Sequence, residues 1–121
     1  MLPAQHRLRS SADFDAVLRR PGRIDAAASL IVVHAKRIPE RADAPARVGF
    51  VVSGSVGGAV VRNRTKRRLR AQCGARLAGF RDGVDYVVRA RPASASATSA
   101  DLGAQLDHAL DRLDRTARRA R

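Results

Sequence analysis

The stretch Arg62-Asn63-Arg64-Thr65-Lys66-Arg67-Arg68-Leu69-Arg70 holds six basic residues in nine positions and no acidic one. It follows the pair Gly57-Gly58, and Val61, Thr65 and Leu69 recur along it at helical spacing. Positive charge at this density raises the free energy of a helix by self-repulsion, which a polyanion partner offsets. Arg guanidinium groups also match phosphate oxygens with two parallel hydrogen bonds. The stretch therefore predicts a helix with one apolar side and a nucleic-acid-binding surface.

The whole composition is strongly basic, because 24 Lys and Arg against 11 Asp and Glu give a net charge of +13 in 121 residues. Such a surface attracts phosphate backbones with an affinity that falls as salt rises. The apolar runs, such as Leu30–Val33, are too short to span a bilayer, and residues 1–6 lack the apolar segment of a secretory signal. The single Cys73 fits a reducing compartment, so we expect a cytoplasmic protein.

Upstream of the basic stretch, the sequence predicts one helix and two strands. The helix begins at Ser10, which has capping-box spacing to Asp13, and ends at Pro21-Gly22. The branched runs Leu30–Val33 and Arg47–Ser53 predict strands that could pair as a hairpin.

Downstream, the basic helix begins near Ala59 and is expected to end at Gly79 or Gly83, before a strand over Asp85–Arg89. Ser99 is expected to cap a last amphipathic helix. The apolar stripe of that helix consists of Leu102, Leu106, Leu110 and Leu113.

The order of these elements is helix, strand, strand, helix, strand, helix, with room for one further strand. This order predicts the α+β class, as a two-layer sandwich with a strand–helix–strand crossover through the basic helix. The length fits one domain over residues 1–121 around a single core. The basic residues Arg118–Arg121 are expected to form a flexible tail.

The central part of the chain carries an ordered motif. Its parts are Arg47-Val48-Gly49, Val52-Ser53, Ala59-Val60, Arg62-Asn63-Arg64, Lys66-Arg67 and Arg70. This order resembles the signature of the bacterial ribonuclease P protein subunit. In addition, Leu8–Phe14 resembles the opening helix of that family and Asp85–Pro92 its last strand, so the resemblance covers roughly residues 7 to 117.

The resemblance implies that the chain binds a large catalytic RNA and helps it to remove the 5′ leader of precursor tRNA. The RNA would carry the chemistry with Mg²⁺, so we expect no catalytic residue and no metal held by the protein. The expected partners are the catalytic RNA and precursor tRNA, without a membrane or protein partner. The family also has a left-handed crossover, where general rules give a right-handed one.

The resemblance assigns two sets of residues to RNA. The residues expected on the catalytic RNA are Arg62, Asn63, Arg64, Lys66, Arg67, Arg68 and Arg70. The residues expected in a leader cleft between the opening helix and the sheet are Phe14, Leu18, Val33, Phe50 and Arg91. The amide of Asn63 could bond RNA or cap the local backbone. Phe14 could stack on a leader base or belong to the core, and Phe50 could be core or cleft floor.

The chain departs from the family pattern at two places. The loop Ser53-Gly54-Ser55-Val56-Gly57 lacks the usual two lysines, and Leu18 and Val33 stand where relatives often carry aromatic rings. With three Phe and one Tyr in the chain, base stacking must be sparse. Leader affinity should therefore depend more on apolar contact and charge.

Two other functions explain part of the sequence. A ribosomal-type or other structural RNA-binding protein explains the charge, although it leaves the ordered motif without a reason. A protein-only nuclease would need a carboxylate cluster for two metal ions, which the sequence does not supply. His6, His34 and His108 have no spacing that suits metal ligation.

Overall fold

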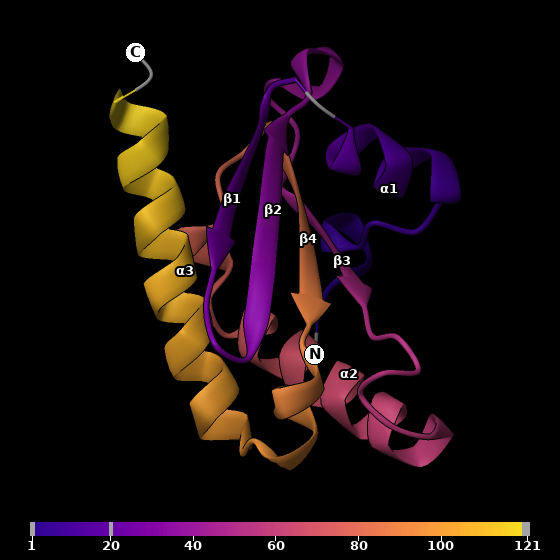
Figure 1. The fold of residues 1–121 in the computed structure, drawn as a ribbon. Coiled ribbons are helices and arrows are strands. Elements are labelled where there is room, and N and C mark those ends of the chain that lie inside the picture. Colours follow the sequence, from indigo (N-terminus) through magenta and orange to yellow (C-terminus); the bar gives the residue numbers. More distant parts are fainter. Residues whose placement is uncertain (1, 20, 120–121) are drawn as a thin grey trace.

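A four-stranded sheet with the order β1-β2-β4-β3 forms the centre of the protein. The structure is a computed structural model that describes residues 2–19 and 21–119. Its helices and strands are α1 (Ser11–Leu18), β1 (Arg23–Ala27), β2 (Ile31–Arg37), β3 (Arg47–Val51), α2 (Ala59–Gly74), β4 (Val84–Ala90) and α3 (Ser99–Arg119). Figure 1 shows α1 and α3 on opposite sides of the sheet.

The expected α+β class is confirmed, and β1 is the further strand. The sheet and the α2–α3 pair form the two main layers, and the short α1 adds a partial third layer on the opposite face. The main core fills the space between the sheet and α2–α3, and includes Val33, Leu69, Val88 and Leu106. A smaller cluster between α1 and the sheet contains Leu8, Val17 and Val87.

The predicted pairing of the strands at Leu30–Val33 and Arg47–Ser53 as a hairpin is wrong. β2 pairs antiparallel with β1 on one side and with β4 on the other, whereas β3 pairs with β4 in parallel. The run Tyr86-Val87-Val88 is buried, with side chains on both faces of the sheet. Because such a strand needs cover on both faces and a neighbour on each side, β4 takes the position between β2 and β3. The expected strand–helix–strand crossover through the basic helix is present, as β3-α2-β4.

Three helix ends illustrate how local chemistry sets the boundaries. Ser10 caps α1 as expected, because its Oγ accepts the Asp13 N–H at 3.1 Å. The cap of α3 is Thr98 and not the predicted Ser99: Thr98 and Asp101 exchange two hydrogen bonds of 3.0 Å in a reciprocal box. α2 ends at Gly74, before the predicted Gly79 or Gly83, and glycine is a weak helix former.

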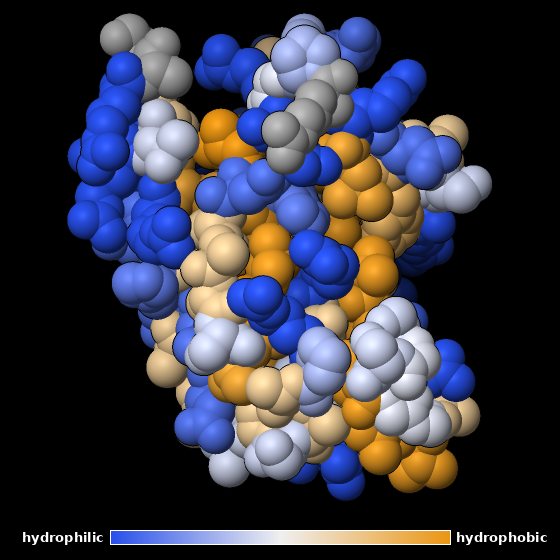
Figure 2. Space-filling view, in the orientation of Figure 1, coloured by the Kyte–Doolittle hydropathy of each residue, from blue (hydrophilic) through white to orange (hydrophobic). Residues whose placement is uncertain are grey.

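The last helix also changes the description of the C-terminus. α3 continues through Arg119, so two residues of the expected flexible tail lie in its final turns. Residues 120 and 121 are outside the described part of the chain. Figure 2 shows hydrophilic side chains along the outer side of the second half of α3. In residues 2–19 and 21–119, none of the helices has the length and apolar character needed to cross a membrane.

Candidate RNA interface

The basic helix α2 turns one side to the core and the opposite side to solvent. Thr65, Leu69 and Cys73 are buried, while Asn63 and Arg67 are exposed. This division follows from the turn of about 100° per residue, which groups positions three and four apart on one side. The helix therefore presents basic side chains outward and along both flanks of its apolar side.

The flank of α2 that faces α3 is partly engaged within the protein. Arg64 Nη2 donates to the Ala95 carbonyl at 3.2 Å, and Arg68 Nη1 donates to the Ala97 carbonyl at 2.7 Å. These bonds tie the segment before α3 to the basic helix. Each guanidinium carries five N–H donors, so both arginines keep groups that can reach a phosphate.

The other flank carries Arg62, Lys66 and Arg70, spaced four residues apart along the helix. The Arg70 guanidinium carbon lies 5.9 Å from the centre of the Phe50 ring, a cation–π contact. The start of α2 presents apolar surface to solvent, because the Val60 side chain is 80% exposed. Figure 2 shows hydrophobic surface there, beside hydrophilic surface.

The charges around α2 are not neutralised by carboxylates. The sequence has no Asp or Glu between Asp43 and Asp82. Within residues 2–19 and 21–119, none of the seven predicted RNA-binding side chains forms an ion pair, because the carboxylates that do so pair with other residues. Those other residues are Arg23, His34, Arg41, Arg47, Arg76, Arg81, Arg115 and Arg118. The field over α2 is therefore positive and suited to an anion.

Val33 does not line the face of the sheet that α1 covers. It is fully buried in the core on the α2–α3 side, where it pairs in register with Val88. Since side chains alternate along a strand, the neighbours Val32 and His34 point to the α1 side. Val33 therefore does not line a cleft between α1 and the sheet, and His34, which does face α1, is itself only 6% exposed.

Phe50 and Phe14 lie on opposite faces of the sheet, which corrects the idea of one shared aromatic cleft. Phe50 packs against the main core, and Gly49 and Val51 point to α1. Phe14 and Leu18 are half-buried over the smaller cluster and keep exposed surface. Phe14 is therefore both a packing residue and a candidate contact.

Two polar residues that face α1, His34 and Arg89, were not among the predicted site residues. His34 Nδ1 lies 2.6 Å from Asp25 Oδ1. Burial raises the pKa of Asp25, but the hydrogen bond and charge of His34 and the nearby Arg23 outweigh it, so this pKa is lowered. Arg89 is exposed on the same face, while the predicted Arg91 donates to the Ala28 carbonyl at 2.7 Å. The two-residue periodicity of β2 and β4 is the sequence signal that could have found them.

The main cleft of the protein lies apart from the predicted RNA-binding and leader-binding residues. A cleft of about 680 Å³ opens beside Ile24, Val84 and Ala117, on the face opposite α1, and contains none of the predicted site residues. No group of three or more His, Cys, Asp or Glu in the described ranges, 2–19 and 21–119, is placed to hold a metal ion.

Comparisons with known proteins agree with this architecture. The sequence pattern of the family described as Ribonuclease P matches residues 2–114. The ribonuclease P protein component of Acidothermus cellulolyticus is 49% identical, over 96% of this chain and 94% of that protein. That of Streptomyces bikiniensis is 45% identical, over 93% and 95%.

Solved structures show the same fold. The RNase P protein of Staphylococcus aureus matches with a TM-score of 0.77 and 26% identity, over 89% of this chain and 94% of that one. The Thermotoga maritima RNase P protein matches with a TM-score of 0.74 and 24% identity, over 88% and 96%. The chain therefore belongs to the ribonuclease P protein family, the protein component of the endoribonuclease that matures the 5′ ends of tRNA.

Proposed function

We propose that α2 docks this protein on the catalytic RNA of ribonuclease P. The observation that carries the proposal is a basic helix whose seven predicted RNA-binding residues form no ion pair with a carboxylate within residues 2–19 and 21–119. Asn63 and Arg67 are exposed, and Arg62, Lys66 and Arg70 form the flank beside Phe50. These five residues carry most of the contact. Arg64 and Arg68 contribute less, because each already holds a backbone carbonyl.

The 5′ leader of precursor tRNA is then held on the opposite face of the sheet, beside α1. Phe14 and Leu18 supply apolar surface there, and the exposed Arg89 supplies a cation. His34 faces the same side in place of Val33, but it is buried and held by Asp25, so it supports this face and adds little contact surface. Arg91, at the end of β4, contributes charge next to the β1–β2 turn. With one half-buried ring on this face, the leader gains more from charge and apolar contact than from stacking.

In the assembled ribonucleoprotein, Mg²⁺ acts through the RNA, and the protein supplies binding and charge compensation in the cytoplasm. Its cations lower the repulsion between the catalytic RNA and precursor tRNA, so the protein should matter most at low Mg²⁺. Precursor-tRNA cleavage assays test this division of labour. Protein alone should cleave nothing, and protein with the RNA should cleave faster at low Mg²⁺ than RNA alone. Robust cleavage by RNA-free protein would overturn the proposal.

Substitution on α2 tests the docking surface. Arg67→Ala and Lys66→Ala should each weaken binding to the catalytic RNA by about 1–3 kcal/mol, the range of hydrogen bonds to charged groups. Each should also flatten the salt dependence by up to about one unit of log–log slope. Arg112→Ala is the matched control, because this exposed arginine lies on α3 and donates to the Ala27 carbonyl. Equal losses from Arg67→Ala and Arg112→Ala would mean that α2 is no specific docking site.

A further inference from the structure

Two residues of β3 hold two consecutive residues of α1. Arg47 and Gly49 lie on the α1 side of the strand, and Val48 between them points into the main core. Arg47 contacts Asp13, and Gly49 contacts Phe14. The segment Arg47-Val48-Gly49 therefore contacts α1 on one side of the sheet and packs into the main core on the other.

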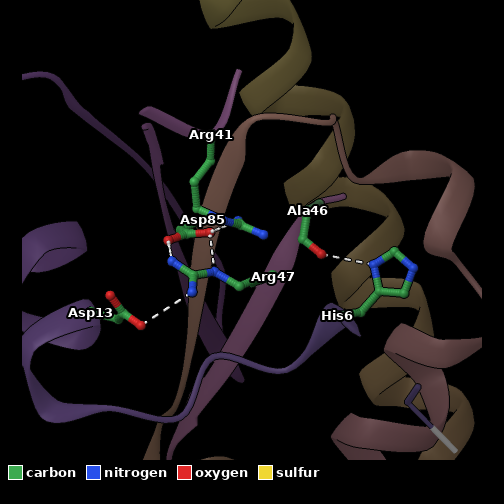
Figure 3. A network of polar contacts seen from close by, with 6 residues as sticks. All are labelled: His6, Asp13, Arg41, Ala46, Arg47 and Asp85. Carbon is green, nitrogen blue, oxygen red and sulfur yellow. Dashed lines mark hydrogen bonds and ion pairs between the residues drawn. The ribbon is translucent and has the colours of Figure 1, made fainter. Parts of the chain in front are cut away.

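Arg47 is held in one orientation by a buried carboxylate (Figure 3). Its Nε and Nη2 donate to Asp85 at 3.0 and 2.6 Å, and Asp85 is 1% exposed. Arg41 donates to the same carboxylate at 3.2 Å. The hydrogen bond of Asp85, then its charge and that of Asp13, outweigh burial and raise the pKa of Arg47. With two nitrogens held by Asp85, the third, Nη1, reaches Asp13 of α1 at 3.2 Å.

Gly49 provides the space for the ring of Phe14. A Cβ on residue 49 would lie 2.4 Å from Phe14 Cζ and 2.6 Å from Cε1, closer than atoms can approach. The ring therefore packs directly on the backbone of β3, and any side chain at position 49 would displace it. Asp13 and Phe14 are neighbours on α1, so one contact is ionic and the next is steric.

We propose that Arg47 and Gly49 are positioning residues that seat α1 on the sheet and thereby set the shape of the leader-binding face. The Asp85–Arg47–Asp13 chain fixes the start of α1, and the Phe14–Gly49 contact fixes its height above the sheet. The inference rests on the proposed function, since the leader is held beside α1. It adds that two residues of β3, the buried Gly49 and the partly buried Arg47, control leader binding without touching the leader.

Two contacts hold α1 on the sheet, the Arg47–Asp13 ion pair and the Phe14–Gly49 contact, and we call them the ionic and steric halves of the α1 seat. The ionic half is tested by Asp13→Asn in the full chain assembled with the catalytic RNA. The control is Asp15→Asn, which makes the same charge change on the same helix at an exposed carboxylate. The readout is the ratio of affinities for leader-bearing and mature tRNA. Asp13→Asn should lower this ratio about two- to fivefold, as expected for a partly exposed ion pair, and Asp15→Asn should leave it unchanged. Equal ratios for both variants would refute the ionic half.

The steric half is tested by Gly49→Ala with nuclear Overhauser contacts of the Phe14 ring as a readout that needs no RNA. The ring should lose its contacts to residue 49 and to Leu8, and the affinity ratio should fall to that of Phe14→Ala. A folded Gly49→Ala protein that keeps the ring contacts to Leu8 and the wild-type ratio would overturn the inference. If Gly49→Ala does not fold, Asp13→Asn alone decides.

Phe14→Ala separates this inference from the proposed function. If Phe14→Ala leaves the affinity ratio unchanged, the leader does not bind beside α1 and the proposed function fails there. If Phe14→Ala lowers the ratio and both seat variants behave like wild type, leader binding stands and the positioning role is refuted.

Discussion

Asp85→Asn should destabilise the protein more than any exposed carboxylate variant. The substitution keeps the size of the side chain but leaves Arg47 and Arg41 facing a neutral amide. The carboxylate is buried and receives hydrogen bonds from both arginines at 2.6 to 3.2 Å. Removing one partner of a buried ion pair typically costs about 3–5 kcal/mol, because the remaining charge is left without compensation.

The geometry allows this figure to be adjusted. The side chains of Arg47 and Arg41 are 20% and 24% exposed, so both guanidinium groups can regain some hydration. We therefore expect a loss of about 2–4 kcal/mol in the free energy of unfolding. For a domain of this size, that corresponds to a melting temperature lower by roughly 8–16 °C.

Thermal and urea unfolding followed by circular dichroism measure this loss. Asp107→Asn is the matched control: it also removes one negative charge next to an arginine, Arg76, but its side chain is 64% exposed. The control should change the free energy of unfolding by about 0.5 kcal/mol or less. If the two variants lower the melting temperature equally, general charge repulsion and not the buried network stabilises the fold, and the reasoning is refuted.

Five further outcomes are expected. Burial raises the pKa of Cys73 to about 12, against the opposing charge of Arg76, so its thiol should resist iodoacetamide at pH 8 until urea is added. The Cys73 thiol of the unfolded chain loses its proton near pH 9, whereas that of the folded chain keeps it up to about pH 12. The contribution of Cys73 to the free energy of unfolding should therefore fall as pH rises from 9 to 12. Urea titrations of the wild type and of Cys73→Ala at alkaline pH measure this fall. Leu18→Phe should strengthen binding of leader-bearing tRNA, by up to about 1–3 kcal/mol if the ring stacks, in filter-binding assays. Val33→Ala should lower the free energy of unfolding by about 1–3 kcal/mol and leave the leader preference intact; a selective loss of leader binding would return Val33 to the site. Sulfate should raise the melting temperature, because a bound anion offsets the +13 charge, and an anion-independent melting temperature would contradict this.

Local patterns in the sequence were enough to locate most of the elements and the basic helix. The spacing of Thr65 and Leu69 fixed which side of α2 faces the core, because helical periodicity depends only on the chain itself. The helix cap at Ser10 and the branched run of β2 were predicted correctly for the same reason. Resemblance of the ordered motif to one family then supplied the function, which charge alone left open between several RNA-binding proteins.

Strand order and the facing of single residues depended on contacts between distant segments. Nothing local to β2 or β3 shows that β4 enters between them, because that choice minimises exposed apolar surface over the whole sheet. A shift of one residue in a strand exchanges its two faces, so the sequence did not show that Val33 faces the main core or that Phe50 and Phe14 lie on opposite faces of the sheet.

The sequence by itself determined the charge, the apolar sides of the helices and the family, because these follow from composition, short-range spacing and ordered motifs. Only the tertiary structure decided that Asp13, Arg47 and Asp85 meet, since they come from α1, β3 and β4 and their contact requires all three to be in place. The seat of α1 is therefore a property of the folded sheet and not of any one segment.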